Sequence, residues 1–280
     1  MTAHDTVCAS VPMRTRLASL RAAPYLQRWH IRLTVSLIVP VALIIIWHLA
    51  VEGGVLPRTL VAGPVDSVTA FARLTADGTL LEHAWVSLRR IAVGFGAGSV
   101  VGIALGSIIG TSRLGSRLLE PTALTLIPVP AVAWIPLLVI TLGIGESSKV
   151  VLVAIGSAAT LILATAAGIR SASHDLVEVS QLYEKSKWTL WSTVLLPSAT
   201  PSIIASARVA MALSWTLLVA AEVIASANGL GWLIWDSRNF ARPAAMIAGM
   251  LAIGILGKTT DTLIARLGVY LTRWDRSYRG

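Results

Sequence analysis

The sequence predicts an all-α integral membrane protein with six transmembrane helices. Apolar residues make up 55% of the 280-residue chain, and the mean hydropathy is +0.75. Charged residues make up 13%, whereas a soluble domain carries about 25%. The apolar residues also gather in six windows long enough to cross a bilayer as helices. The chain has too few charges to surround a soluble globule and too much apolar surface to remain disordered.

The charged residues define the limits of these six windows. Four windows contain no Asp, Glu, Lys or Arg, and they span residues 34–51, 91–112, 121–145 and 150–169. The fifth, 209–235, is interrupted only by Glu222. The sixth is charge-free over 243–257 and is expected to continue through Lys258 and Asp261 to about residue 267.

The distribution of basic residues predicts how the helices are oriented. An even number of crossings puts both chain ends on one side. Fourteen lysines and arginines lie in the two tails and the loops around 113–117 and 170–187, whereas seven lie in the opposite loops. Cytoplasmic loops collect Lys and Arg, so both termini are expected in the cytoplasm of the bacterial inner (plasma) membrane. This bias accounts for the net charge of +9 without a nucleic-acid partner.

The predicted organisation is a single transmembrane domain with two short tails. A basic cytoplasmic tail covers residues 1–32, the six-helix domain covers 33–268, and a cytoplasmic C-terminal tail covers 269–280. Between the first two windows, Pro64 precedes apolar Val65, Val68 and Phe71 at helical spacing. A short helix is expected there because proline suits a first helical turn. It lies either at the outer membrane interface or in an ordinary surface loop.

Glycines recur at every fourth position of the second window. They are Gly94, Gly98, Gly102, Gly106 and Gly110. On an α-helix these positions form one narrow stripe, and small residues on a stripe let a second membrane helix approach closely. The stripe therefore predicts tight helix packing and carries no information about a substrate.

Prolines and isolated charges mark the third, fifth and sixth windows. Pro128, Pro130 and Pro136 each remove a backbone donor, so they predict a bent helix that either faces a transport path or only shapes the bundle. Glu222 is expected either to line a polar path or to bond a neighbouring helix. Lys258 and Asp261 have the i, i+3 spacing of a pair on one helix face. The candidate path-lining residues are Pro128, Pro130, Trp134, Ser214, Trp215 and Glu222.

The sequence contains no motif that would support enzyme chemistry or a metal site. The segment 254–260 imitates the end of a phosphate-binding loop, but the motif requires glycine where Ala252 stands, and the segment lies in an apolar helix. The five histidines show no metal-ligand spacing, and Cys8 is the only cysteine. Neither a catalytic residue nor a cofactor is therefore expected.

The loop at about 170–197 is the most polar internal segment. Apolar Leu176, Val179, Leu182 and Tyr183 follow helical spacing among polar residues. The pattern predicts a short amphipathic helix, a turn, and a second helix that ends at Pro197. The apolar face of such a helix needs a partner, which is either the membrane surface or a soluble protein.

This loop resembles the coupling loop of the permease subunits of binding-protein-dependent ABC importers, which has the pattern E-A-A-x3-G-x9-I-x-L-P. Glu178, Val179, Ser180, Leu196 and Pro197 match or nearly match that pattern, and the sequence departs from it at Glu184, where the family usually has glycine. Within the family the chain is most similar to the nitrate, sulfonate and taurine branch. That similarity rests on stretches around His83–Phe95, Ile127–Leu137, Leu142–Lys149, Ala220–Gly231 and Leu271–Trp274.

The resemblance implies a type I ABC importer permease-like bundle with a cytoplasmic coupling helix. It implies that the loop, Tyr183 and Glu184 included, docks on a cytoplasmic ATPase subunit that hydrolyses ATP. It also implies a homodimer, an external substrate-binding protein, and a small anionic nutrient such as an alkanesulfonate, taurine or nitrate. Replacing Glu178 with lysine is then expected to uncouple transport. The alternative is a self-sufficient secondary transporter or channel, which explains the prolines and buried charges equally well but gives no reason for the loop pattern.

Overall fold

Helices account for every regular element of the described residues, which confirms the all-α class. The computed structural model describes residues 25–183 and 186–273. The chain divides into two units, Met1–Val55 and Leu56–Gly280. The first unit contains α1 (Tyr25–Glu52). The second contains α2 (Pro64–Ala76), α3 (Thr79–Thr111), α4 (Arg113–Leu126), the 3-10 turn η1 (Ala131–Trp134), α5 (Ile135–Leu142), α6 (Glu146–Arg170), α7 (His174–Leu182), α8 (Lys187–Leu190), the π-helical turn η2 (Trp191–Leu195), α9 (Leu196–Ala225), α10 (Leu230–Asn239) and α11 (Pro243–Leu271).

Four helical segments of the described residues are long and apolar enough to cross a membrane. They are α3, α6, the continuous run from α8 through α9, and α11. The bent pair α4 and α5 makes a fifth span if its two parts are taken together. In α1 the apolar stretch Ile38–Glu52 falls short of a full span. The predicted helix at residues 64–74 is confirmed as α2, with Pro64 in its first turn.

The third apolar window does not form one helix. It is divided between α4 and α5, whose axes differ by 87°. Ser112 starts α4 well before the window because its side chain accepts a hydrogen bond from the Gly115 amide. The helix ends at Leu126, directly before the segment that contains Pro128 and Pro130. Two residues without an amide donor so close together cannot continue the helical hydrogen bonds, so the bend predicted from the prolines is a complete break.

Two predicted helix boundaries are wrong. The fifth span does not cover 209–235, because α9 begins at Leu196 and ends at Ala225. The chain then turns through Gly229, whose φ of +105° favours glycine, into the separate helix α10. The second helix of the polar loop also does not end at Pro197. This residue lies in the first turn of α9, where a missing amide donor is tolerated, and the π-helical turn η2 precedes it.

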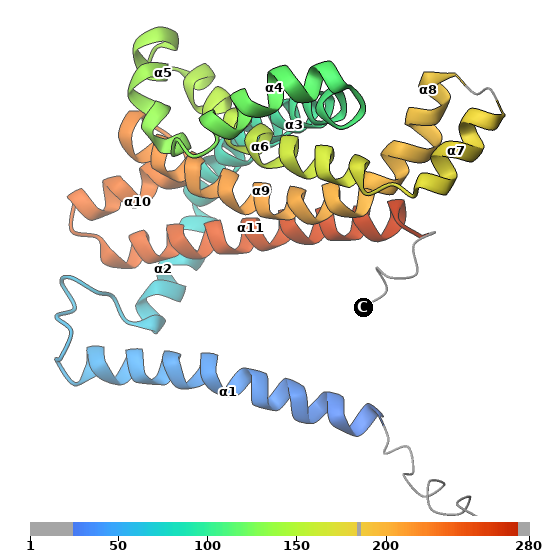
Figure 1. The fold of residues 1–280 in the computed structure, drawn as a ribbon. Coiled ribbons are helices and arrows are strands. Elements are labelled where there is room, and N and C mark those ends of the chain that lie inside the picture. The colour runs from blue at the N-terminus through green and yellow to red at the C-terminus, as the bar shows by residue number, and fades with distance from the viewer. Residues whose placement is uncertain (1–24, 184–185, 274–280) are drawn as a thin grey trace, which may run out of the picture. The chain divides into compact units, whose positions relative to one another are not determined.

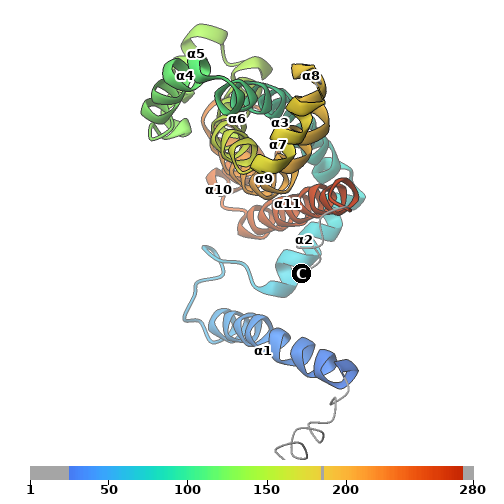
Figure 2. The same ribbon diagram turned by 45° about the vertical axis from the view of Figure 1, so that its right-hand side comes forward.

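The core of the second unit lies where α3, α6, α9, α10 and α11 meet. One cluster joins Leu80 and Ile91 of α3 to Val153, Trp215 and Leu230. Figure 1 shows α6, α9 and α11 running side by side, with α7 and α8 at one end of these helices and α5 and α10 at the other. In the turned view of Figure 2, α3 lies beside α6 and α9. The polar loop and the α9–α10 turn are therefore at opposite ends of the same bundle.

Candidate functional site

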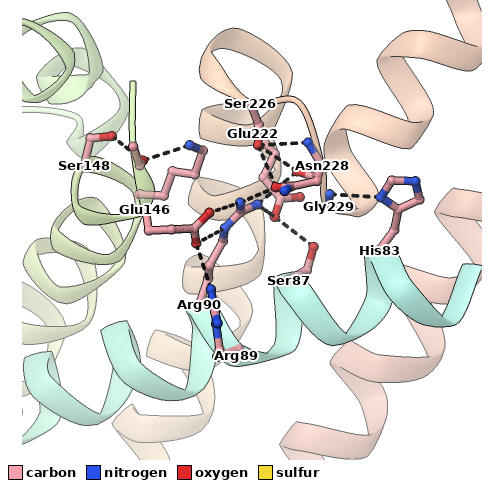
Figure 3. A network of polar contacts seen from close by, with 12 residues as sticks. His83, Ser87, Arg89, Arg90, Glu146, Ser148, Glu222, Ser226, Asn228 and Gly229 are labelled. Carbon is pink, nitrogen blue, oxygen red and sulfur yellow. Dashed lines mark hydrogen bonds and ion pairs between the residues drawn. The ribbon is translucent and has the colours of Figure 1, made fainter. Parts of the chain in front are cut away.

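A buried polar network joins three long helices at the α10 end of the bundle. At its centre is Arg90 of α3, whose side chain is 1% exposed. Its Nη1 donates to Glu222 Oε1 of α9 at 2.7 Å, and its Nε and Nη2 donate to Glu146 of α6 at 2.8 and 2.5 Å. Figure 3 shows the guanidinium between the two carboxylates. The Arg90 guanidinium of α3 thus links the carboxylates of two other helices, α6 and α9.

Glu222 is completely buried and fully bonded. Besides Arg90, it accepts hydrogen bonds from Ser87 Oγ and from the Gly231 amide, each at 2.8 Å. The expectation left open whether Glu222 lines a path or bonds a neighbouring helix, and the contacts are those of a helix-to-helix bond. Gly231 is needed beside it, because a Cβ there would lie 2.8 Å from Glu222 Cβ.

The network also holds the turn between α9 and α10. Arg90 donates to the Asn228 carbonyl at 3.0 Å and to Asn228 Oδ1 at 2.5 Å. The amides of Gly229 and Leu230 donate to His83 Nδ1 and Ser87 Oγ at 3.1 and 2.9 Å. Side chains therefore satisfy the backbone where the helical hydrogen bonds stop, as buried polar groups require. The network contains no catalytic arrangement, and its chemistry is to hold the turn.

Sequence reasoning missed Arg90 as the partner of Glu222. The sequence places Arg90 among the basic residues on the minority side of the membrane, and no local spacing connects it to Glu222, 132 residues away. A usable signal was present, because a helix that contains an uncompensated glutamate needs a buried cation from another helix.

The coupling-loop candidates project from the opposite end of the bundle. On α7, Glu178 and Val179 are exposed and Ser180 is buried. Leu182 is 82% exposed and Tyr183 74%, so these two residues of the expected apolar face are not covered within the second unit. Leu196 and Pro197 are half-buried where η2 joins α9. Glu184 lies outside the described residues.

On α8, Trp188 is a further exposed apolar side chain. Its side chain is 71% exposed and stacks on Trp191 with ring centroids 4.9 Å apart. Arg170, four residues before α7, donates two hydrogen bonds of 2.8 and 2.6 Å to the carboxylate of Glu120 in α4. This pair fixes the end of α6 from which the polar loop departs.

The candidate path-lining residues fall into two groups. Ser214, Trp215 and Glu222 are buried inside the second unit, and Trp215 Nε1 donates to Thr260 of α11 at 3.1 Å. Pro128 and Pro130 are exposed at the break between α4 and α5, and Trp134 is half-buried beside them. An apolar groove of about 320 Å³ lies along this broken span and is lined by Val132, Ala133, Ile135, Pro136, Val139, Ile144, Ile224 and Ala225.

The five glycines of the stripe, Gly94, Gly98, Gly102, Gly106 and Gly110 of α3, lie against α6. A Cβ at Gly94 or Gly102 would lie 2.8 Å from the Cβ of Val153 or Leu161, and one at Gly110 would lie 2.9 Å from that of Ile169. At Gly106 it would approach the Ile162 carbonyl oxygen to 2.5 Å, and at Gly98 it would meet the backbone of Ala154. Such contacts leave no room for any larger side chain.

These features define an all-helical membrane protein with a broken span, a buried polar network at one end and an exposed helical loop at the other. The family described as "binding-protein-dependent transport system inner membrane component" matches residues 98–274, and the chain belongs to this family. It is therefore the permease component of an ABC importer, a family in which a separate subunit hydrolyses ATP.

The chain is similar to known permeases over most of its length. It is 35% identical over 252 residues to SsuC of Escherichia coli, a permease protein named for aliphatic sulfonate transport, covering 90% of this chain and 95% of SsuC. It is 34% identical over 183 residues to the nitrate import permease protein NrtB of Synechocystis, and this region covers 65% of this chain and 66% of NrtB. Its fold matches the inward-facing MetNI methionine ABC transporter with a TM-score of 0.59 and 20% identity, covering 68% of this chain and 94% of that one.

Proposed function

We propose that this permease forms the membrane path of an importer for small organic sulfonates. The observation that carries the substrate class is the extent of similarity to SsuC, which covers 90% of this chain, whereas similarity to NrtB covers 65%. The protein works as a homodimer with both termini in the cytoplasm. The excess of Lys and Arg in the tails and in the loops near 113–117 and 170–187 supports that orientation.

Helices α7 (His174–Leu182) and α8 (Lys187–Leu190), which we call the α7–α8 hairpin, dock on the cytoplasmic ATPase subunit. Val179, Leu182, Tyr183 and Trp188 are 48%, 82%, 74% and 71% exposed, which leaves four apolar side chains available to a partner. Closure of the ATPase pair on ATP would then move this hairpin, and α9, which continues directly from it, would transmit the movement to the other end of the bundle.

Replacing Leu182 with aspartate is expected to release the ATPase. Full burial of a leucine contributes about 1.5–3 kcal/mol, and an unpaired carboxylate in its place adds a desolvation cost, so ATPase affinity is expected to fall by roughly tenfold or more. The measurement is the amount of ATPase that co-purifies with a tagged chain. Val65→Asp is the matched control, because Val65 is a 65% exposed apolar residue of α2 outside the hairpin. Equal ATPase recovery from both variants would contradict docking at Leu182.

The first test of the importer assignment is co-purification from the native cell in mild detergent. Recovery of an ATPase subunit together with a second, differently tagged copy of this chain is expected. A stable chain that transports without any ATPase would instead establish the secondary-transporter alternative.

The substrate class is tested with the reconstituted complex and its binding protein. Ethanesulfonate and taurine are expected to stimulate ATP hydrolysis and to compete with each other for uptake, whereas nitrate is not. Stimulation by nitrate alone would move the protein to the nitrate importers while leaving the ATPase coupling intact.

A further inference from the structure

Lys149, in the first turn of α6, is a buried ammonium with few acceptors around it. It is 2% exposed, and its Nζ donates to the Gly145 carbonyl oxygen at 2.9 Å. Within the described residues this is its one hydrogen bond, and the carboxylates of Glu146 and Glu222 bond Arg90 instead. Lys258, by contrast, lies 3.5 Å from Asp261 Oδ2, which confirms the pair expected from their spacing on α11. Two of the three N–H donors of Lys149 are therefore unused.

A small cavity lies beside this ammonium. It is lined by Lys149 and Ser148 together with apolar side chains of α5, α6 and α9, and its volume is about 10 Å³. That is about the space that one water-sized oxygen needs. A buried charge is costly unless it is paired and hydrogen-bonded, so an acceptor oxygen in this cavity would be stabilised.

The cavity adjoins the apolar groove of the broken span. Ile135, Val139 and Ala225 line both the cavity and the groove, so the two are contiguous. The groove has a volume of about 320 Å³, within the range of about 300–1,000 Å³ of small-molecule sites, and every residue that lines it is apolar. Together they form one site that is apolar over most of its length and positively charged at one end.

This polarity fits an anion that carries an apolar chain. The oxygens of a sulfonate headgroup can accept from the Lys149 ammonium, and an alkyl chain that leaves water for the groove gains the free energy of apolar burial. Nitrate has no chain and would use only the charged end. The site also lies at the α5 and α10 end of the bundle, opposite α7 and α8 (Figure 1). In the proposed orientation this is the outer end, at which a substrate arrives.

We propose that Lys149 and the apolar groove form a binding site for an aliphatic sulfonate in the outer part of the membrane path. One headgroup oxygen occupies the small cavity beside Lys149, and the alkyl chain lies along the groove past Ile135 and Val139. This assignment rests on the proposed function and names the residues that select for the charge and for the chain.

The test measures binding of ³⁵S-labelled alkanesulfonates to the purified permease–ATPase complex without its binding protein. Scintillation proximity detects the bound ligand, and an excess of unlabelled ligand defines non-specific uptake into detergent. Ethanesulfonate, butanesulfonate and hexanesulfonate are compared. Affinity is expected to rise along this series by up to about fourfold for each added methylene, because each one buries further apolar surface in the groove.

Two variants separate the headgroup from the chain. Lys149→Met keeps the length of the side chain and removes its charge, so affinity should fall about tenfold or more, and by the same factor for ethanesulfonate and hexanesulfonate. Val139→Trp fills the groove, so it should weaken hexanesulfonate by about tenfold and leave ethanesulfonate nearly unchanged. Ile140→Trp is the matched control, because Ile140 is the next residue of α5, is 82% exposed and does not line the groove. A monodisperse complex that retains its ATPase shows that each variant is folded.

Four outcomes would overturn the assignment. Equal affinities for ethanesulfonate and hexanesulfonate would exclude the groove as the site of the chain. Unchanged binding to Lys149→Met would exclude the ammonium as the site of the headgroup. Equal losses in Val139→Trp and Ile140→Trp would reveal a general disturbance of α5. An anionic phospholipid that co-purifies with the parent and is lost from Lys149→Met, without any sulfonate binding, would assign the groove to lipid.

The same complex distinguishes failure of this site from failure of the proposed function. If ethanesulfonate and its binding protein stimulate ATP hydrolysis but the expected binding pattern is absent, the site alone is wrong. If the complex lacks an ATPase or responds only to nitrate, the proposed function is wrong.

Discussion

Replacing Gly98 with leucine is expected to remove most of the folded protein from the membrane, whereas replacing Gly96 in the same way is tolerated. A Cβ at Gly98 would lie 2.9 Å from Ala154 Cα and closer still to the Ala154 carbonyl oxygen and Ser157 Oγ. The first two are backbone atoms of α6, which cannot move aside without separating the helices. At Gly96 no atom lies within 4 Å of the added Cβ.

The direction of this result is decided by packing. Leucine is a better helix former than glycine by roughly 0.8–1 kcal/mol, so intrinsic propensity favours both substitutions. Overpacking costs about 1–3 kcal/mol or more, and a whole side chain inserted against backbone lies at the upper end of that range. Gly98→Leu is therefore expected to lose the monodisperse peak of a fluorescent fusion in size-exclusion chromatography. Equal peaks and equal Tm values for the two variants would contradict close packing of α3 on α6.

The parts of the fold that were predictable depend on patterns along one helix. The glycine spacing identifies a packing stripe because residues four apart lie on the same side of a helix. The clustered prolines locate the break between α4 and α5, since each removes a donor at a known position. The apolar face of α7 follows from Val179, Leu182 and Tyr183 at helical spacing. None of these inferences requires knowledge of which helices are neighbours.

What was not predictable depends on contacts between distant segments. The absence of charge between Val223 and Trp235 gives no sign that α9 ends at Ala225, because the turn is stabilised by Arg90, His83 and Ser87 from another helix. The same applies to Arg208, whose partner Asp261 is 53 residues away. Hydropathy reports that a residue is costly in lipid, and only the packed structure shows what compensates the cost.

Replacing Arg90 with methionine is expected to have the second large effect. It would leave Glu222, which is 0% exposed, without its cation and would release Asn228 in the α9–α10 turn. Breaking a buried ion pair by removing one partner costs about 3–5 kcal/mol because a charge is left uncompensated. We expect a strong fall in Tm in detergent and loss of the folded fraction in the membrane.

The adjacent Arg89 provides the matched control. Its side chain is 59% exposed and its Nη2 lies 3.6 Å from Glu146 Oε2. Exposed pairs contribute about 0–1 kcal/mol, so Arg89→Met is expected to change the Tm only slightly although it removes the same charge one position away. Similar losses for the two variants would mean that net charge, and not the buried pair, stabilises this end of the bundle.

A double-mutant cycle separates the ion pair from the rest of the network. Glu222→Gln removes the negative charge and keeps one acceptor oxygen, which can accept from the Gly231 amide while the side-chain NH2 group donates to Ser87 Oγ. In Arg90→Met combined with Glu222→Gln no buried charge is left unpaired at position 222, so the double variant should be more stable than the sum of the single losses predicts. Additive losses would show that the contribution of Arg90 comes from Glu146 and the Asn228 turn. In that case Arg90 would stabilise the protein by holding α6 and the α9–α10 turn, and the charge of Glu222 would not be needed for stability.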